Sequence, residues 1–189
     1  MKRILGFLLA AALFCVQIPT ANALSISASS AILMDGDSGR VLYAKNIHEP
    51  RLIASITKLM TALVAAESGH DLQETVTVQP EWVGVEGSSL YLKAGEQVTL
   101  ETLLYGLLLR SGNDAATAVA GFCGGSIEAF VGAMNDKAQS LGMNNTHFAN
   151  PHGYTNAQHY TTARDMALIT KALLQNEKFL EIESHSEHK

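Results

Sequence analysis

Apolar and polar residues follow patterns that predict a hairpin near the start of the chain and a helix soon after it. Two short apolar runs, residues 31–34 and 41–44, flank the turn-forming stretch DGDSG, which is typical of a β-hairpin. From Ile56 onward, apolar residues recur at every third or fourth position as far as Gly69. This spacing predicts an amphipathic helix that ends at Gly69.

Helical spacing returns in four later segments, after an irregular stretch. Residues 74–79 alternate like a short strand, whereas the stretch that follows is rich in turn formers and predicts little regular structure. The four predicted helices are residues 100–109, 113–123, 127–141 and 163–176. Candidate N-caps precede three of them: Thr99, Ser126 and Thr162. Asp165 would complete a capping box with Thr162. The chain has no internal repeat and no long linker, so the predicted order is a hairpin followed by a cluster of helices.

Residues 1–23 have the pattern of a secretory signal peptide. A basic start, Met1-Lys2-Arg3, precedes the apolar run ILGFLLAAALFCVQI, and Ala21-Asn22-Ala23 supplies a small-x-small cleavage site. The apolar run is shorter than the roughly 20 residues that span a bilayer. We therefore expect cleavage after Ala23, export to a bacterial cell envelope and a mature domain of residues 24–189.

Composition and charge indicate one globular domain and exclude some classes of partner. With 189 residues, of which 47% are hydrophobic, the chain can bury one sizeable core. Cleavage would remove Lys2, Arg3 and Cys15, which leaves 11 basic against 18 acidic residues and a formal charge of −7. This acidic balance argues against nucleic acid as a partner. The remaining cysteine, Cys123, has no second cysteine for an internal disulfide and is expected to be a small packing residue.

The segment ASITKLMTALVA places Ser55 and Lys58 in a helix that otherwise carries apolar residues. Residues three apart lie on one helical face, so the lysine amine can approach the serine hydroxyl. A desolvated lysine has a lowered pKa and can accept the proton of a serine nucleophile. The start of the helix, where backbone N–H groups lack partners, would stabilise an oxyanion at Ser55. The structural alternative is an N-cap serine beside a surface lysine, which this tetrapeptide alone does not exclude.

A second candidate group is Ser111-Gly112-Asn113, in the short connection between two apolar helices. A loop at such a place can direct a hydroxyl and an amide toward a neighbouring site. Ser111 can pass a proton between Lys58 and a leaving amine, and Asn113 can hold both the lysine and a substrate carbonyl. A plain helix–helix turn with Asn113 as N-cap is the alternative. The two motifs together are more specific than either one.

The pair S-x-x-K and S-x-N occurs in penicillin-binding proteins and class A β-lactamases. Longer stretches carry the resemblance further: IASITKLMTALVA, GSSLYLKAGEQVTLETLLYGLLLRSGNDAATAVA, MNDKAQSLGMNNTHFANPHGY and HYTTARDMALI. From about Ser30 to about Phe179 the chain resembles the low-molecular-mass penicillin-binding proteins that are serine-type D-Ala-D-Ala carboxypeptidases, peptidase family S11. The resemblance implies an α+β fold of the β-lactamase/DD-peptidase type. In that fold a helical cluster packs on an antiparallel sheet, of which this chain carries only the N-terminal hairpin.

The resemblance also implies roles for four residues and identifies the partners. Ser55 would be the acylated nucleophile and Lys58 its general base. Ser111 would relay protons, and Asn113 would bind the substrate. The implied substrate is the D-Ala-D-Ala end of a peptidoglycan stem peptide, and β-lactam antibiotics would acylate the same serine. No cofactor is implied, and many relatives associate peripherally with the membrane, which is expected of the full-length form here.

One motif of the family is missing from the sequence. In relatives K-[ST]-G binds the substrate carboxylate, on a strand whose backbone completes the oxyanion hole, but neither K-T-G nor K-S-G occurs in the 189 residues. One oxyanion-hole donor is worth about 2.7 to 4 kcal/mol of the barrier. The chain is therefore interpreted as a catalytic domain incomplete at its C-terminus. Two alternatives to the carboxypeptidase stay open, a D,D-endopeptidase with the same catalytic groups and an inactive fragment. A class A β-lactamase is disfavoured because no E-x-x-L-N segment is present.

The remaining histidines and aromatic residues are expected to have structural roles. Three loop histidines are spaced by five and seven residues, unlike helical metal-ligand pairs: His147, His152 and His159. No metal site is therefore predicted, and the second of these histidines is expected to hold its loop in place. His185 and His188 are expected in a solvated tail. Core packing is the expected role of Trp82 and Tyr91, with a groove lining as the alternative.

Overall fold

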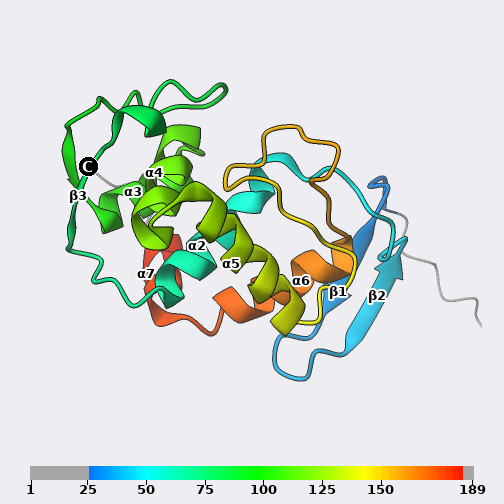
Figure 1. Cartoon of the computed structure of the whole chain (residues 1–189). Helices are drawn as coiled ribbons and strands as arrows, with labels where there is room; N and C mark the ends of the chain where they lie inside the picture. The colour runs from blue at the N-terminus through cyan, green and yellow to red at the C-terminus, as the bar shows by residue number, and fades with distance from the viewer. Residues whose placement is uncertain (1–25, 185–189) are drawn as a thin grey trace, which may run out of the picture.

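The computed structural model describes residues 26–184, and helix α2 (Lys58–Glu67) runs through the middle of their helical cluster (Figure 1). The helices that pack around α2 are α3 (Leu100–Leu109), α4 (Asn113–Gly124), α5 (Ile127–Ser140), α6 (Ala163–Leu173) and α7 (Glu177–Ser184). The predicted signal peptide at residues 1–23 and the predicted tail histidines His185 and His188 lie outside the described residues.

The predicted β-hairpin is confirmed at the edge of the helical cluster. Strand β1 (Ala31–Met34) pairs antiparallel with β2 (Val41–Lys45), and the register places Ala31 opposite Lys45. Figure 1 shows α6 lying along β1, and residues of these two elements are in contact. Helices thus cover one side of a small antiparallel sheet, which is the expected α+β arrangement.

The stretch between α2 and α3 contains more regular structure than its turn-rich sequence predicts. Strand β3 (Thr75–Thr77) forms where alternation predicts a strand, but it pairs with a second strand, β4 (Gln97–Thr99), in a segment expected to be irregular. Between them lies a 3-10 turn, η2 (Pro80–Trp82), and an extended loop. The expectation for β4 was wrong because three residues are too short for a periodic signal, and the pairing comes from a distant partner.

The three predicted N-caps are confirmed, but the predicted capping box at Thr162 is only half formed. The hydroxyl oxygens of Thr99, Ser126 and Thr162 each accept a hydrogen bond from a backbone N–H in the first turn of their helices. The reciprocal half of the capping box at Thr162 was wrong. The carboxylate of Asp165 is fully buried and accepts from the backbone N–H of Asn145, at 3.0 Å, and the hydroxyl of Thr146, at 2.9 Å.

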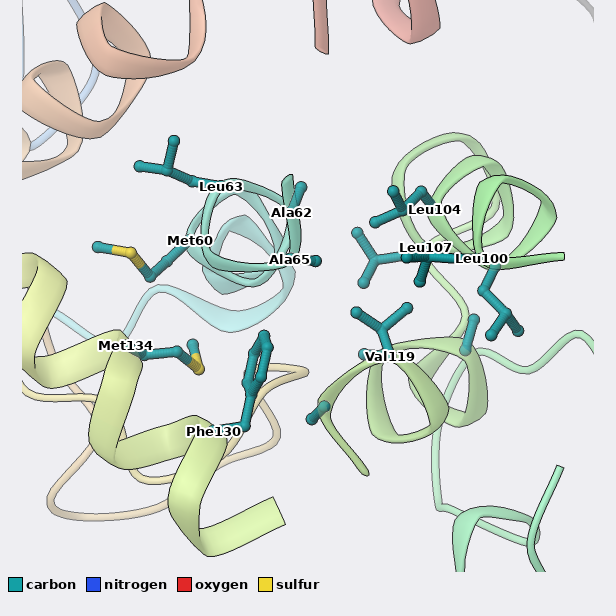
Figure 2. Close-up of a cluster of buried hydrophobic side chains, with 14 of the residues drawn as sticks. Met60, Ala62, Leu63, Ala65, Leu100, Leu104, Leu107, Val119, Phe130 and Met134 are labelled. Atoms are coloured by element: carbon teal, nitrogen blue, oxygen red, sulfur yellow. The ribbon is translucent and has the colours of Figure 1, made fainter. Parts of the chain in front are cut away.

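The core forms where α2 meets its neighbours, and Figure 2 shows its central side chains. Met60 of α2 lies on the side of Phe130 and Met134 of α5, and the alanines of α2 face leucines of α3 and Val119 of α4. Leu63 is also buried and projects from the other side of α2, away from α5. Helix α7, which the sequence did not predict, buries Phe179 against the same core. Within the described residues no single helix is long and apolar enough to cross a bilayer, although the bent pair α4 and α5 passes together by length and composition.

Candidate active site

Ser55 lies in a 3-10 turn, η1 (Ala54–Thr57), directly before α2. The prediction that it stands at or just before the first helical turn is therefore confirmed. Ala54 has a φ of +47°, in the left-handed region that non-glycine residues rarely adopt. The Ser55 residue is exposed, and it borders a cavity of about 320 Å³. The residues lining this cavity are Ser55, Ile56, Lys58, Leu59, Leu107, Leu108 and Ser111.

Lys58 is almost completely buried, with 3% of its surface exposed. Its Nζ donates to the side-chain oxygen of Asn113 at 2.7 Å, to the carbonyl oxygen of His152 at 3.0 Å and to the hydroxyl of Ser111 at 3.3 Å. Three acceptors match the three N–H donors of an ammonium group. When the amine loses a proton, the longest of these contacts is the first that can be given up. The freed lone pair can then face a hydroxyl in the cavity.

Burial lowers the pKa of Lys58 from 10.5 to about 8, because removal from water disfavours the charged form. The carboxylate of Asp114 acts in the opposite direction and raises this pKa. The result is an amine that is neutral in a substantial fraction of molecules near pH 7 to 8. Such an amine can serve as a general base.

The second motif forms the turn between α3 and α4, as predicted. Ser111 has a φ of +57°, and Gly112 rather than Asn113 occupies the N-cap position of α4. The alternative of Asn113 as a cap is therefore wrong, because its side chain is engaged elsewhere. Its amide oxygen binds Lys58, and its amide nitrogen donates to the carbonyl of Glu86 at 2.6 Å. The turn thus directs both the hydroxyl and the amide toward the lysine.

Two loops meet beside the lysine. One loop follows η2 and contributes Glu86, whose carbonyl binds Asn113. The other contributes the His152 carbonyl to Lys58. The Glu86 side chain of the first loop raises the pKa of Tyr154 in the second. The lysine is therefore enclosed by segments that are far apart in the sequence.

Asp114, which the sequence analysis did not single out, anchors the first of these loops. Its carboxylate accepts hydrogen bonds from the backbone N–H groups of Leu90, Leu92 and Ala115 and from the Ser89 hydroxyl. Burial alone would raise its pKa, but these donors bring the pKa below its usual value. The available signal was an acidic residue at the start of an otherwise apolar helix, where negative charge is favoured.

The structure brings Lys58, Ser111 and Asn113 into direct contact and places Ser55 at the border of the same cavity. Among the hydrogen bonds of residues 26–184, none joins the Ser55 hydroxyl to the lysine amine. A larger cavity of about 670 Å³ lies on the other side of the Ser55 turn, between that turn, β1 and α6. It is lined mostly by apolar residues and does not include Lys58. The smaller cavity is therefore the candidate active site, because Ser55, Lys58 and Ser111 all line it.

The other residues singled out from the sequence have structural surroundings. Trp82 is buried against α4, in agreement with the packing prediction, but Tyr91 is 85% exposed and the same prediction for it was wrong. Cys123 packs against the core, and burial raises the pKa of its thiol. The ring of His152 accepts a hydrogen bond from a backbone N–H within its own loop. No group of three or more potential metal ligands occurs within residues 26–184.

The hairpin and the helical cluster around α2 form an α+β fold that this chain shares with solved penicillin-binding DD-peptidases. In this chain the fold places a serine before the central helix and a buried lysine that is hydrogen-bonded to a Ser-Gly-Asn turn. A family model described as D-alanyl-D-alanine carboxypeptidase matches residues 17–189. The chain belongs to this family, peptidase family S11.

Curated relatives agree with this assignment. The chain is 40% identical over 190 residues to the D-alanyl-D-alanine carboxypeptidase DacF of Bacillus subtilis, covering 94% of this chain and 49% of DacF. It is 44% identical over 161 residues to DacA of Escherichia coli K12, covering 80% of this chain and 40% of DacA. The chain thus spans about half the length of the curated relatives it matches.

Solved structures show the same fold. Penicillin binding protein 6B of Escherichia coli superimposes with a TM-score of 0.85 at 32% identity, covering 91% of this chain and 58% of that one. The carboxypeptidase DacD of Francisella tularensis superimposes with a TM-score of 0.80 at 36% identity, covering 84% of this chain and 39% of that one.

Proposed function

We propose that the protein is a serine-type D-alanyl-D-alanine carboxypeptidase that acts on peptidoglycan stem peptides through an acyl-enzyme at Ser55. The observation that carries this proposal is the buried Lys58 amine. It has a pKa of about 8, contacts Ser111 and Asn113, and shares a cavity with the serine. Family membership supports the same reaction.

In the proposed mechanism the neutral amine of Lys58 takes the hydroxyl proton of Ser55. The serine oxygen attacks the carbonyl carbon of the penultimate D-alanine, and the C–N bond to the last D-alanine breaks. The proton held by Lys58 passes through the Ser111 hydroxyl to the leaving amine, and Asn113 orients the substrate carbonyl. Water then hydrolyses the ester, and Ser55 recovers its proton.

Penicillins would enter this pathway as imitations of the D-Ala-D-Ala terminus. Attack of Ser55 on the β-lactam carbonyl opens the ring and leaves no separate amine to depart, so the ester persists. The same proposal includes export to the bacterial cell envelope, where peptidoglycan is found, and peripheral association with the membrane in the full-length form. A net acidic sequence agrees with a partner other than nucleic acid.

Intact-mass spectrometry of the purified chain after incubation with benzylpenicillin tests the proposal. The expected result is a mass increase equal to one penicillin, which is absent in Ser55→Ala. After digestion, the added mass is expected on the peptide that contains residue 55. A folded sample with no mass increase would remove the assignment. Release of D-alanine from a D-Ala-D-Ala peptide, measured in parallel, tests the carboxypeptidase reaction itself.

A further inference from the structure

The turn that carries Ser55 has a backbone conformation that its own sequence does not favour. Ala54 has a φ of +47°, in the left-handed region where the Cβ of an L residue crowds the neighbouring carbonyl oxygen. Such a conformation persists only where its surroundings determine it. The surroundings here are the loop of residues 147–159, which Figure 1 shows passing beside the start of α2.

A chain of hydrogen bonds runs from this loop to the turn. The Thr57 hydroxyl lies 2.8 Å from the carbonyl oxygen of Ala54, and the Nε2 atom of His159 lies 2.6 Å from the same hydroxyl. On the other side of the ring, the backbone N–H of Ala149 donates to Nδ1 of His159 at 3.1 Å. Both Thr57 and His159 are buried, so water does not replace these partners.

The direction of every bond in this chain follows from the first donor. A backbone N–H can only donate, so Nδ1 of His159 is an acceptor and carries no proton. In a neutral imidazole the proton then sits on Nε2, which donates to the Thr57 oxygen. The hydroxyl hydrogen of Thr57 is left to donate to the Ala54 carbonyl. Burial lowers the pKa of His159 to about 4, which keeps the ring neutral at physiological pH.

The backbone of the same loop also packs closely against this carbonyl. Gly153 has a φ of +85°, and a Cβ atom added there would fall well inside van der Waals contact with the Ala54 carbonyl oxygen. The loop is also tied to the helical cluster, because Phe148 exchanges two hydrogen bonds with the Asn135 side chain of α5. The Ala54 carbonyl therefore accepts a hydrogen bond from the Thr57 side chain and packs against the Gly153 backbone of a loop that is itself fixed.

We infer that His159 is a positioning residue for the nucleophile. Through Thr57 it holds the Ala54 carbonyl, and this fixes the strained turn so that Ser55 faces the cavity shared with Lys58. The inference rests on the proposed function in one respect, that Ser55 is the nucleophile. Neither His159 nor Thr57 touches the reacting atoms, so their effect is on the geometry of Ser55.

Thr61 supplies a matched control one turn further along α2. Its hydroxyl is fully buried and donates to the Pro151 carbonyl of the same loop at 2.6 Å, but it makes no bond to the Ser55 turn among the described residues. Thr57→Val and Thr61→Val remove the same group from the same helix–loop contact. Both are expected to lower the melting temperature. Only Thr57→Val is expected to slow acylation by penicillin, by about tenfold or more, because misplacing a nucleophile is costly.

Three further variants connect the effect to the Thr57 hydroxyl and to the histidine. Thr57→Ser keeps the hydroxyl and is expected to acylate within about threefold of wild type. His159→Leu removes the donor and is expected to slow acylation as Thr57→Val does, whereas His159→Gln can donate from its amide and is expected to recover much of the rate. Equal slowing by Thr57→Val and Thr61→Val would overturn the inference, since the role would then be structural only.

A measurement that needs no activity separates this inference from the proposed function. Nuclear magnetic resonance of the ¹⁵N-histidine-labelled chain is expected to show His159 as the neutral tautomer with its proton on Nε2. Amide exchange at Ile56, whose N–H donates to the Ile53 carbonyl oxygen at 3.2 Å, is expected to be faster in Thr57→Val and unchanged in Thr61→Val. An Nδ1 proton, or equal exchange in the two variants, refutes the inference. If the wild-type chain takes up no penicillin, the proposed function fails, and the amide-exchange result alone decides whether His159 positions the Ser55 turn.

Discussion

The proposed role of Lys58 as a general base makes a quantitative prediction for the pH dependence of acylation. Burial lowers its pKa from 10.5 to about 8, against the opposing effect of the Asp114 carboxylate. At pH 7 the neutral fraction of the amine is then about 10%, compared with about 0.03% for an unperturbed lysine. Only the neutral amine can accept the Ser55 proton. The second-order rate constant for acylation is therefore expected to rise about 50-fold between pH 6 and pH 8 and to level off above.

Labelling with a fluorescent penicillin measures this rate constant directly. The reaction is stopped at intervals, and the adduct is quantified by gel fluorescence in buffers of constant ionic strength from about pH 5.5 to about pH 10. Ser55→Ala supplies the blank for non-specific labelling. Circular dichroism at each pH establishes that the chain is folded.

Two profiles would refute the reasoning. A rate that continues to rise beyond about pH 10 indicates a lysine with an ordinary pKa, and a rate independent of pH indicates that Lys58 is not the base. Lys58→Arg is the control for charge, because a guanidinium group keeps its proton over the whole range. This variant is expected to show no acylation at any pH.

Three further predictions concern the supports of the site. Gly153→Ala forces a Cβ atom into the carbonyl oxygen of Ala54 and is expected to lower the free energy of unfolding by about 2 kcal/mol or more, measured by urea titration. The control Gly132→Ala, at an open position on α5, is expected to raise the free energy of unfolding slightly. Asp114→Asn offers one acceptor oxygen to donors that the carboxylate now satisfies, so we expect it to lower the free energy of unfolding by about 2 to 4 kcal/mol. The pH at which acylation of Ser55 is half-maximal should also fall, because the anion that raises the pKa of Lys58 is gone. Because the pKa of His159 is about 4 in the folded chain and 6.5 in its unperturbed state, the unfolded chain takes up the proton first as pH falls, and stability should decrease between pH 6.5 and pH 4; His159→Gln should show a smaller pH dependence.

Most helices of this protein could be predicted because they carry their own local signals. Thr99, Ser126 and Thr162 stand at the starts of α3, α5 and α6, where a side-chain oxygen satisfies a first-turn N–H without help from the rest of the fold. Strand β4 and helix α7 carry weaker local signals. Their positions depend on pairing with β3 and on burial of Phe179 against α2, which are contacts over long sequence distances.

The candidate site also contains some residues that local sequence predicts and others that it does not. The spacing of Ser55 and Lys58 is a local property, so it could be found in the sequence, and the Ser111-Gly112-Asn113 turn could be found as a break between two apolar helices. The hydrogen bonds of Asp114 and His159 could not, because their partners come from loops about 20 and 100 residues away in the chain.

The amino-acid sequence by itself determined the N-terminal hairpin, the existence and the capped starts of the main helices, and the spacing of Ser55 and Lys58. These features depend on periodicity and on neighbours within one or two turns. The tertiary structure decided how deeply Lys58 is buried, and hence that its pKa lies near 8. It also decided that a distant histidine reaches the Ser55 turn through Thr57. Desolvation and long-range hydrogen bonding arise only when separate segments exclude water together, and no local pattern records which segments will meet.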